Sequence, residues 1–512
     1  MPRNPVLPGF HPDPSVCRVG ETFYLATSSF EYFPGLPLYR SDTLVDWEPV
    51  GHALTRESQL DTREARISGG IFAPTLRHHD GTFYLTSTDT SGDGHFVVTA
   101  DDPAGQWSDP VSVDAPGIDP DLFFEGDTCY FTYFTTDTDR GIEQAEIDLE
   151  TGELSDQRTV WSGYEDPHAE APHLYERAGT YYLVVAEGGT HTGHSVMVGR
   201  SDDPTGPFEP HPDNPILTHR EDFYHDVRAT GHADLVTDAD GNWWLVCLGV
   251  RPQGGFPGWH HLGRETFLAP VRWEEGWPVV EGGALPAEID AAALPGDGGA
   301  AGAGESASPD PVEYTDTDFS DGRPHEFCYR RTPQRDRYEF TADGLVLRGG
   351  PETLDERGTT LLARRQTNVD CRVRADLGFD PDPGEEAGLA LVMDEDHHYE
   401  VGVARGDGGD TDRGDDRTAE AVVRLTIGDA TDVLAREAVG ESVTLGVDAA
   451  AETYEFRVDG ESVAEARPKY LSTEVAGGFT GVMVGPYAVA GDGPADATPA
   501  RVERFRYEPA ER

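Results

Sequence analysis

One alternation of apolar and polar residues occurs five times in the first part of the chain. In each copy a short apolar run meets a turn containing Gly or Asp, and a second run rich in aromatic and aliphatic residues follows. Two such runs around a tight turn predict a β-hairpin. The copies are residues 13–28 (DPSVCRVGETFYLATS), 73–88 (APTLRHHDGTFYLTST), 119–134 (DPDLFFEGDTCYFTYF), 171–186 (APHLYERAGTYYLVVA) and 232–249 (HADLVTDADGNWWLVCLG).

Weaker echoes after most of the hairpins add a turn and an outer strand, as in SDTLVDWEPV, ADDPAGQWSDPV and SDDPTGPFEPHPDNPIL. About four strands per unit, in repeated units, predict a five-bladed β-propeller whose first strands line the central axis. The first residues of the copies should then meet at the mouth of that axis. We call them the corner positions: Asp13, Ala73, Asp119, Ala171 and His232.

Proline follows the corner position in four of the five copies. A residue before proline is disfavoured in the helical region, so we expect extended backbone at these positions and side chains held in one direction. Phe72 and Glu170 each stand one residue ahead of a corner position. We expect both at the same mouth.

Beyond residue 290 the sequence AAALPGDGGAAGAGESASPDP is too poor in large apolar residues to pack, and it predicts a linker. The remainder alternates with the period of strands, as in CRVRADLGF and GLALVMDEDHHYEVGV. The sequence therefore predicts an all-β protein. Its domains are a propeller over residues 1–290, a linker over 291–311 and a second β-sandwich over 312–512.

Acidic residues dominate the charge: 95 Asp and Glu stand against 39 Lys and Arg, which gives a formal net charge of -56. Because these acids are spread through every segment, they predict an acidic surface, which salt would screen. We interpret the chain as salt-adapted, since this charge exceeds what solubility requires. Nucleic acid and anionic membranes would be repelled, so neither is expected as a partner.

The first residues, MPRNPVLPGF, contain no apolar core of a signal peptide, and no apolar stretch reaches the length that crosses a bilayer. Five scattered cysteines, none in a CxxC pair, do not predict a disulfide framework or a zinc site. We therefore expect a cytoplasmic protein with reduced, buried cysteines. The sequence leaves open whether several copies assemble.

Three acids, Asp13, Asp119 and Glu170, begin apolar inner strands. An Asp before Pro is often only a turn residue, but burying a charge is unfavourable unless the charge has a partner or a use. Three carboxylates that converge on one axis suit glycosidic cleavage, in which one carboxyl group donates a proton and another acts as base or nucleophile. The third would raise the pKa of the proton donor by repulsion. His232 is equally well explained as a catalyst, a metal ligand or a core histidine.

A series of short motifs follows in chain order: NPVLPGFHPDPSV, SSFEYFPGLPLYRS, GGIFAPTL, GIDPDLFF, EAPHLY, AEGGT, GHADLV and LGRETF, with the tail pieces AGLALVMDEDHHYEVGV and GGFTGVMVG. The motifs resemble the β-xylosidase branch of glycoside hydrolase family 43, and the tail pieces are similar to its C-terminal domain. The resemblance implies a five-bladed propeller followed by a jelly-roll or concanavalin-like sandwich. It also implies an exo-acting, inverting enzyme that releases β-D-xylose from the non-reducing end of xylo-oligosaccharides.

The resemblance further implies individual roles. Asp13 would be the general base, Asp119 the residue that adjusts the pKa of the acid, and Glu170 the general acid. The residues implied around the sugar are Phe30, Phe72, Thr190, His232, Arg264 and the tail residue Phe479. No cofactor is needed for the chemistry, but similar enzymes often have a calcium ion beside the axial histidine, here His232.

The chain departs from the family pattern at two places. Phe72 replaces the usual Trp, which shrinks the stacking face, and Met483 stands where a second Phe is common. Whether Phe479 or Met483 reaches the pocket stays open. The main alternative activity is α-L-arabinofuranosidase, alone or as a second activity, and a sugar-binding propeller without catalysis is a further alternative.

Overall fold

The computed structural model describes residues 2–135, 141–165, 168–222, 224–296, 314–405, 419–491 and 497–510. So far as these residues are described, the chain divides into two compact units. The first is Met1–Asp61, Gly69–Pro252 and Arg264–Pro311, and the second is Thr62–Ser68, Gln253–Gly263 and Val312–Arg512. Most of the predicted linker lies outside the described residues. The fold is all-β, as predicted: a five-bladed propeller and a β-sandwich.

Each blade of the propeller is an antiparallel sheet whose first four strands follow chain order from the axis outward, apart from the short strand β3 (Tyr32–Phe33). The bounds are β1 (Ser15–Val19), β2 (Thr22–Ala26), β4 (Gly35–Ser41) and β5 (Glu48–Leu54); β6 (Thr75–His79), β7 (Thr82–Asp89), β8 (Gly94–Ala100) and β9 (Val111–Val113); β10 (Ile118–Glu125), β11 (Thr128–Thr135), β12 (Gly141–Ile147) and β13 (Leu154–Trp161); β14 (Glu170–Arg177), β15 (Thr180–Glu187), β16 (Ser195–Ser201) and β17 (Glu209–Pro210), with β18 (Leu217–Thr218) also on β16; β19 (Arg228–Thr237), β20 (Trp243–Val250), β21 (Glu265–Glu274) and β22 (Trp277–Val280), followed by η1 (Glu281–Gly283).

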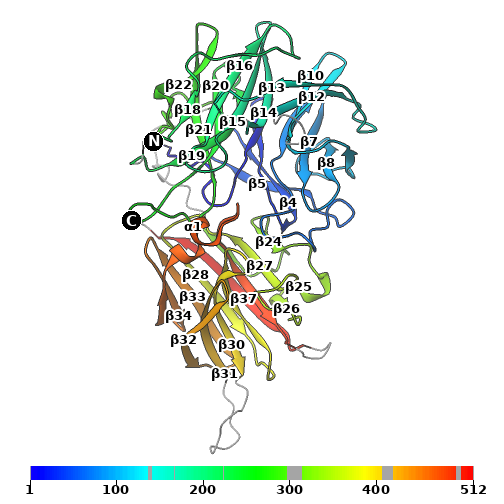
Figure 1. Cartoon of the computed structure of the whole chain (residues 1–512). Helices are drawn as coiled ribbons and strands as arrows, with labels where there is room; N and C mark the ends of the chain where they lie inside the picture. Colours follow the sequence, from blue (N-terminus) through cyan, green and yellow to red (C-terminus); the bar gives the residue numbers. More distant parts are fainter. Residues whose placement is uncertain are drawn as a thin grey trace, which may run out of the picture. The chain divides into compact units, whose positions relative to one another are not determined.

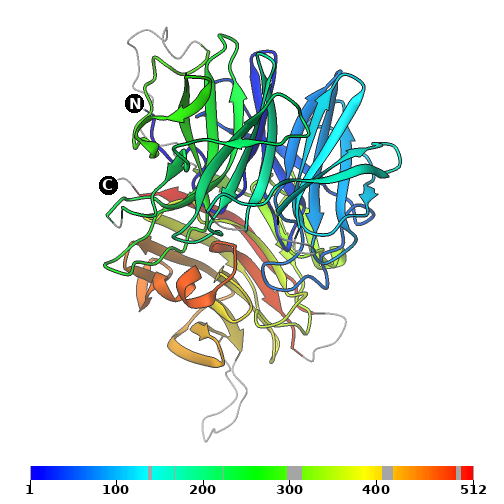
Figure 2. The same cartoon turned by 45° about the horizontal axis from the view of Figure 1, so that its top comes forward.

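The innermost strands form a closed ring, because β1, β6, β10, β14 and β19 contact one another in that order and β19 contacts β1. Figure 1 and Figure 2 show the blades coloured from blue to green along this order. The N-terminal segment fastens the last blade: the Val6 backbone donates to Thr266 O at 2.9 Å, and the Asn4 side chain donates to Leu268 O at 2.8 Å. Apolar clusters fill the space between neighbouring blades.

Turn chemistry explains the inner hairpins. Asp80 and Gly81, which join β6 to β7, both have positive φ, as do Ala178 and Gly179 between β14 and β15. Two consecutive positive φ values are the signature of a type I′ turn, whose twist matches that of the flanking strands. The predicted hairpins are therefore present in these blades.

The second unit is a sandwich of two antiparallel sheets. One sheet has the order β25-β26-β37-β28-β33-β34-β35, with β23 on β37, and the other contains β24-β27-β36-β29-β30-β31-β32. The bounds are β23 (Thr315–Thr317), β24 (Phe327–Arg330), β25 (Tyr338–Thr341), β26 (Gly344–Leu347), β27 (Thr360–Arg365), β28 (Cys371–Gly378), β29 (Glu386–Val392), β30 (His397–Arg405), β31 (Ala419–Ile427), β32 (Ala430–Ala438), β33 (Ser442–Ala450), β34 (Thr453–Val458), β35 (Glu461–Ala466), β36 (Met483–Val489) and β37 (Ala500–Pro509), with η3 (Arg335–Arg337), η4 (Pro468–Leu471) and α1 (Thr473–Ala476).

Burial along β28 alternates strictly, with Cys371, Val373, Ala375 and Leu377 buried between more exposed neighbours. This period of two places one face of the strand in the core of the sandwich. In Figure 1 the long red strand β37 lies beside β28. All five cysteines are free and buried. Within the described residues no helix is long and apolar enough to cross a membrane.

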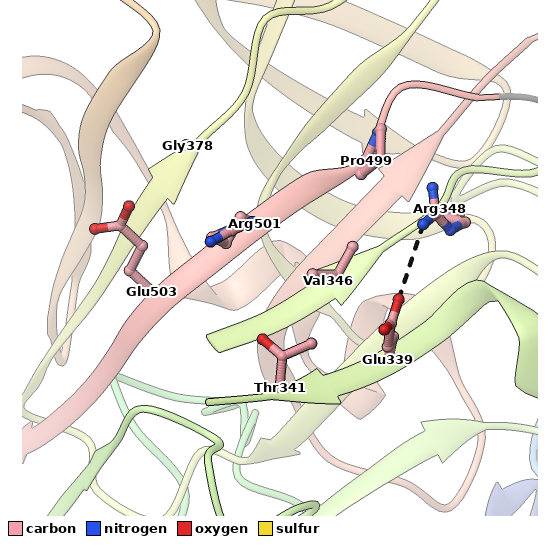
Figure 3. A pocket seen from close by; sticks show the side chains of 8 residues that line it. All are labelled: Glu339, Thr341, Val346, Arg348, Gly378, Pro499, Arg501 and Glu503. Carbon is pink, nitrogen blue, oxygen red and sulfur yellow. Dashed lines mark ion pairs between the residues drawn. The ribbon is translucent and has the colours of Figure 1, made fainter. Parts of the chain in front are cut away.

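Figure 3 shows a pocket of about 390 Å³ on the sandwich. The residues that line it are Glu339, Thr341, Val346, Arg348, Gly378, Pro499, Arg501 and Glu503. Arg348 and Glu339 form an ion pair across it at 3.8 Å. None of these side chains is aromatic, so the pocket lacks the stacking face that sugar sites use.

Candidate active site

The backbone at the corner positions differs from the prediction. Asp13, Asp119 and Ala171, which each precede a proline, have φ between 52° and 56°, which is left-handed and not extended. Ala73, which also precedes a proline, is not among the residues with positive φ. His232, which precedes an alanine, has φ 49°. In the third, fourth and fifth blades the pairing of the two inner strands shifts register at this point, which marks a β-bulge. The proline rule describes a preference of an isolated dipeptide, and here the tertiary structure overrides it at a cost of about 1 kcal/mol or more per residue.

Asp13 is almost completely buried, with an exposed fraction of 4 %. Arg264 donates from Nη1 to its Oδ1 at 2.8 Å and from Nη2 to its Oδ2 at 3.3 Å. Ser28 donates from Oγ to Oδ2 at 2.5 Å. Burial alone would raise the pKa of Asp13, but Arg264, His232 and the Ser28 hydrogen bond together hold it below its usual value. The carboxylate is therefore ionised, as a general base must be.

Asp119 has the opposite electrostatics. It is also buried, and its pKa is raised well above the ordinary range by burial and then by the negative charges of Glu170 and Asp13. The Ala171 backbone N–H donates to its Oδ2 at 3.1 Å. Because Ala171 follows Glu170 directly, this bond ties the Asp119 carboxyl to the strand that carries Glu170. Because the two carboxyl groups repel each other when both are ionised, they titrate as a pair, and the raised pKa of Asp119 favours its protonated form.

Glu170 is the first residue of β14 and pairs with Ala186 on β15. It is partly exposed, unlike the other two acids. The structure thus brings all three predicted carboxyls into one electrostatic neighbourhood. The partly exposed one is the one assigned to the leaving group, which must remain accessible to substrate.

Two predicted aromatic residues form one face. The Phe30 and Phe72 rings lie 5.1 Å apart between centroids, and Phe10 packs against Phe30 at 5.8 Å. The Arg264 guanidinium carbon lies 5.6 Å from the centroid of Phe30. Phe30 is 2 % exposed and Phe72 is partly exposed, so Phe72 offers more of its ring for stacking.

Arg264 joins the remaining predicted residues. Besides holding Asp13, its Nη1 donates to Thr190 Oγ1 at 3.2 Å. His232 Nδ1 lies 3.6 Å from Asp13 Oδ1, and burial lowers the pKa of His232 to about 4, so the imidazole is neutral at pH 7. Asp13, Thr190, His232 and Arg264 therefore form one contact network, with Phe30 beside it.

The tail residues lie in the second unit. Phe479 is 38 % exposed, and its backbone N–H donates to Ser68 Oγ at 2.9 Å. Met483 is the first residue of β36 and is fully buried. That Phe479 closes the pocket stays a prediction.

A second layer of side chains fills the axis beneath the corner positions. Arg77 donates to Asp121 at 2.7 Å and to Asp234 at 2.9 Å, and both carboxylates are completely buried. His173 Nδ1 lies 3.2 Å from Asp121, and the Tyr175 hydroxyl donates to Asp234 at 2.5 Å. This network, which we call the axial network, places a buried cation between two carboxylates and joins the inner strands β6, β10, β14 and β19.

The predicted calcium ion can be tested against these residues. Calcium takes six to eight oxygen ligands. In the part of the chain that is described, no group of three or more His, Cys, Asp or Glu side chains is arranged to hold a metal ion. His232 faces Asp13, and Asp121 and Asp234 are engaged by Arg77. The described side chains alone therefore do not build a calcium site at His232, and no chemical step below uses one.

Sequence reasoning missed two residues of the site, Ser28 and His194. His194 is 1 % exposed and packs on Gly231, where an added Cβ would lie 2.3 Å from its Nε2. Burial lowers the pKa of His194 to about 3, so it is neutral. A signal for Ser28 existed: it ends the first hairpin, beside the corner position Asp13. His194 lies in the loop after AEGGT, and nothing in its local sequence marks it.

Two protein-family models match the chain. The model described as glycosyl hydrolases family 43 matches residues 2–278, and the beta xylosidase C-terminal concanavalin A-like domain matches residues 316–508. The chain belongs to glycosyl hydrolase family 43. Its second unit is accordingly a concanavalin-like sandwich, as predicted.

Relatives within family 43 carry two activities in their names. The chain is 39 % identical to a non-reducing end alpha-L-arabinofuranosidase of Bacteroides ovatus over 99 % of this chain and 94 % of that one. It is 38 % identical to a xylosidase/arabinosidase of Butyrivibrio fibrisolvens over 78 % and 80 %. The solved structure of a xylan beta-1,4-xylosidase from Bacillus halodurans superposes with a TM-score of 0.88 at 32 % identity, covering 99 % and 100 %. The enzyme is thus a glycoside hydrolase of the xylosidase and arabinofuranosidase type.

Proposed function

We propose that this family 43 enzyme releases β-D-xylose from the non-reducing end of short xylo-oligosaccharides with inversion of configuration. One observation carries the proposal. The pKa of Asp13 is lowered while that of Asp119, beside Glu170, is raised. Glycosidic cleavage needs this division, because one carboxyl group must be ionised to act as base while a second, here Glu170 coupled to Asp119, supplies a proton to the leaving oxygen.

In the proposed reaction Glu170 donates its proton to the glycosidic oxygen as the bond to the anomeric carbon breaks. Asp13 takes a proton from a water molecule that attacks the opposite face of the same carbon. The product sugar leaves with the α configuration. Room for this water requires the Asp13 and Glu170 carboxyl groups to be about 6.5–9.5 Å apart, against about 5 Å in a retaining enzyme.

The exo mode is supported by the Bacteroides ovatus relative, which is named as acting at the non-reducing end. The axial network ties inner strands together beneath the corner positions, so we place the substrate at the mouth of the axis. A chain end can enter the mouth and stop there. Phe72 offers a stacking face, and Arg264 and Thr190 offer hydrogen-bonding groups to the ring hydroxyls.

The second candidate function is α-L-arabinofuranosidase, alone or beside the xylosidase activity. The Bacteroides ovatus relative, which is named for that activity, aligns with 99 % of this chain. A terminal arabinofuranose is also a pentose, and it would need the same three carboxyl groups. The described contacts of the site suit both sugars.

The two candidate functions are distinguished by measuring kcat/KM for 4-nitrophenyl β-D-xylopyranoside and 4-nitrophenyl α-L-arabinofuranoside under identical conditions. We expect the larger kcat/KM for the xyloside. Asp13→Asn should lower both rates by about a hundredfold or more, because both need the same base. A larger kcat/KM for the arabinofuranoside would reverse the order of the candidates, and full activity of the variant would refute the role of Asp13.

Other expectations remain proposals. We retain the cytoplasmic location and the salt-adapted surface, which rest on the residues alone. The calcium ion, if present, would need ligands beyond the side chains described above. Metal analysis of the purified protein would measure its content.

A further inference from the structure

Glu187 is a buried carboxylate outside the three proposed catalytic residues. It is the last residue of β15 and is 1 % exposed. Its neighbour Ala186 pairs with Glu170 across the strands β15 and β14. Because a charge buried at such a place is costly unless it is hydrogen-bonded, the partners of Glu187 show what holds it there.

Among the described residues, N–H groups of Trp161, Tyr164 and Glu165 donate to the Glu187 carboxylate. The Trp161 indole donates from Nε1 to Oε1 at 3.0 Å, the Tyr164 backbone donates to Oε1 at 2.6 Å, and the Glu165 backbone donates to Oε2 at 2.8 Å. All three donors lie between the end of β13 and the start of β14. Glu187 therefore fastens residues 161–165, which precede Glu170 in the chain, to the strand that pairs with Glu170.

The Trp161 ring extends this attachment into the core. It belongs to the same apolar cluster as Ala169, which directly precedes Glu170. Its other side lies over Gly199 of β16, where an added Cβ would be 2.6 Å from the ring atom Cζ3. The hydrogen bond from the Trp161 indole to Glu187 thus fixes a ring that shares an apolar cluster with Ala169, the residue before Glu170.

Glu187 also begins the turn toward the other half of the site. Gly188 follows with φ 86°, and a Cβ there would lie 2.2 Å from Gly193 O, so only glycine fits. Two residues later Thr190 accepts a hydrogen bond from Arg264, which holds Asp13. Glu187 is therefore held on the Glu170 side by its hydrogen bonds and stands three residues before Thr190, which contacts the Asp13 side.

We propose that Glu187 is a positioning residue that holds Glu170 in the orientation for proton donation to the leaving group. This inference rests on the proposed function. When an amide of the same shape replaces this carboxylate, its NH2 group must face one of the N–H donors and cannot accept a hydrogen bond from it. Glu187→Gln should then displace residues 161–165, and with them Glu170, by a small distance. A small displacement of a catalytic group lowers the rate strongly.

The test compares a substrate with a poor leaving group, xylobiose, with the activated 4-nitrophenyl xyloside. For Glu187→Gln we expect kcat on xylobiose to fall by about tenfold to a hundredfold, with little change on the aryl xyloside, since only xylobiose needs a well-placed proton. Trp161→Phe, which removes the indole N–H donor and leaves a smaller aromatic ring, should show the same selective loss at smaller size. It also serves if Glu187→Gln fails to fold.

Asp238→Asn is the matched control. Asp238 is 2 % exposed and also accepts a tryptophan indole N–H, from Trp244 at 3.1 Å, together with backbone N–H groups. It lies past the far end of β19 from the corner position His232. Asp238→Asn should therefore not lower kcat on xylobiose more than kcat on the aryl xyloside.

The outcomes separate the inference from the function on which it rests. Glu170→Ala should itself show selective loss on xylobiose. If it does, and Glu187→Gln lowers kcat equally on both substrates or on neither, the positioning role is overturned and the proposed function stands. If Glu170→Ala affects both substrates equally, or the wild-type protein cleaves neither, the proposed function fails and the inference fails with it.

Discussion

Asp13 and Asp119 occupy the same position in two copies of one repeat, yet their pKa values move in opposite directions. The difference lies in their neighbours. Asp13 receives two hydrogen bonds from Arg264 and one from Ser28, whereas Asp119 receives one backbone N–H and faces Glu170. Burial is common to both, so the neighbouring charges decide which carboxyl group ionises first.

Asp119→Asn should shift the pH profile of the enzyme. Asp119 and Glu170 repel each other when both are ionised, which raises the pKa at which the pair loses its last proton. Asparagine at position 119 removes this repulsion, so Glu170 then loses its proton at lower pH. The alkaline limb of kcat/KM on xylobiose should therefore move to lower pH, and the acid limb, set by Asp13, should move less. Profiles of the wild type and the variant measure this directly. An unchanged limb, or one that moves to higher pH, would contradict the coupling, and Asp238→Asn supplies the control.

Among individual residues, the sequence predicts the three carboxyl groups of the site better than the side chains around them. Asp13 and Asp119 repeat at equivalent positions, and Glu170 precedes a third, so their convergence can be read from the chain. Ser28 could have been found from its place at the end of the first hairpin, beside Asp13, whereas His194 reaches the site through the fold and no local pattern marks it. Whether Phe479 reaches the sugar depends on the placement of the second unit, which no sequence pattern specifies.

Among the elements, the inner hairpins are predictable because each is a local event. The turn at Asp80 and Gly81 needs only residues that accept positive φ, and the runs on either side are apolar. The left-handed corner positions are not predictable in this way. At Asp119 a local rule favours extended backbone, and the bulge that overrides it depends on register with the next strand.

At two short segments the domain boundaries cannot be predicted from the sequence. Residues 62–68 and 253–263 stand within the predicted propeller range, but they cluster with the second unit. Within that unit Arg331 donates to Ala65 O at 2.8 Å, and His260 pairs with Glu474 at 2.8 Å. Such contacts join residues more than two hundred positions apart, so a change in composition along the chain cannot reveal them.

For the whole molecule, charge is the dominant feature. A net charge of -56 produces self-repulsion that the ion pairs do not remove, since many pairs, such as Arg40 with Glu48, are largely exposed and contribute little. Repulsion among surface charges weakens as the Debye length falls from about 10 Å at 0.1 M salt to about 3 Å at 1 M.

The melting temperature should therefore rise steeply between about 0.1 M and 1 M KCl and then level off as screening saturates. Differential scanning calorimetry across a KCl series at pH 7 measures it. Because only screening is invoked, NaCl at equal ionic strength should act alike. A flat or falling curve would remove the salt-adapted interpretation and leave the catalytic account intact.

The central claim is that Asp13 and Glu170 act on opposite faces of one sugar linkage. Proton NMR of xylobiose during hydrolysis tests it most directly, because the anomeric protons of α- and β-xylose are resolved before mutarotation mixes them. The account predicts that α-D-xylose appears first from the non-reducing end. Initial release of β-D-xylose, or no cleavage of xylobiose, would contradict it.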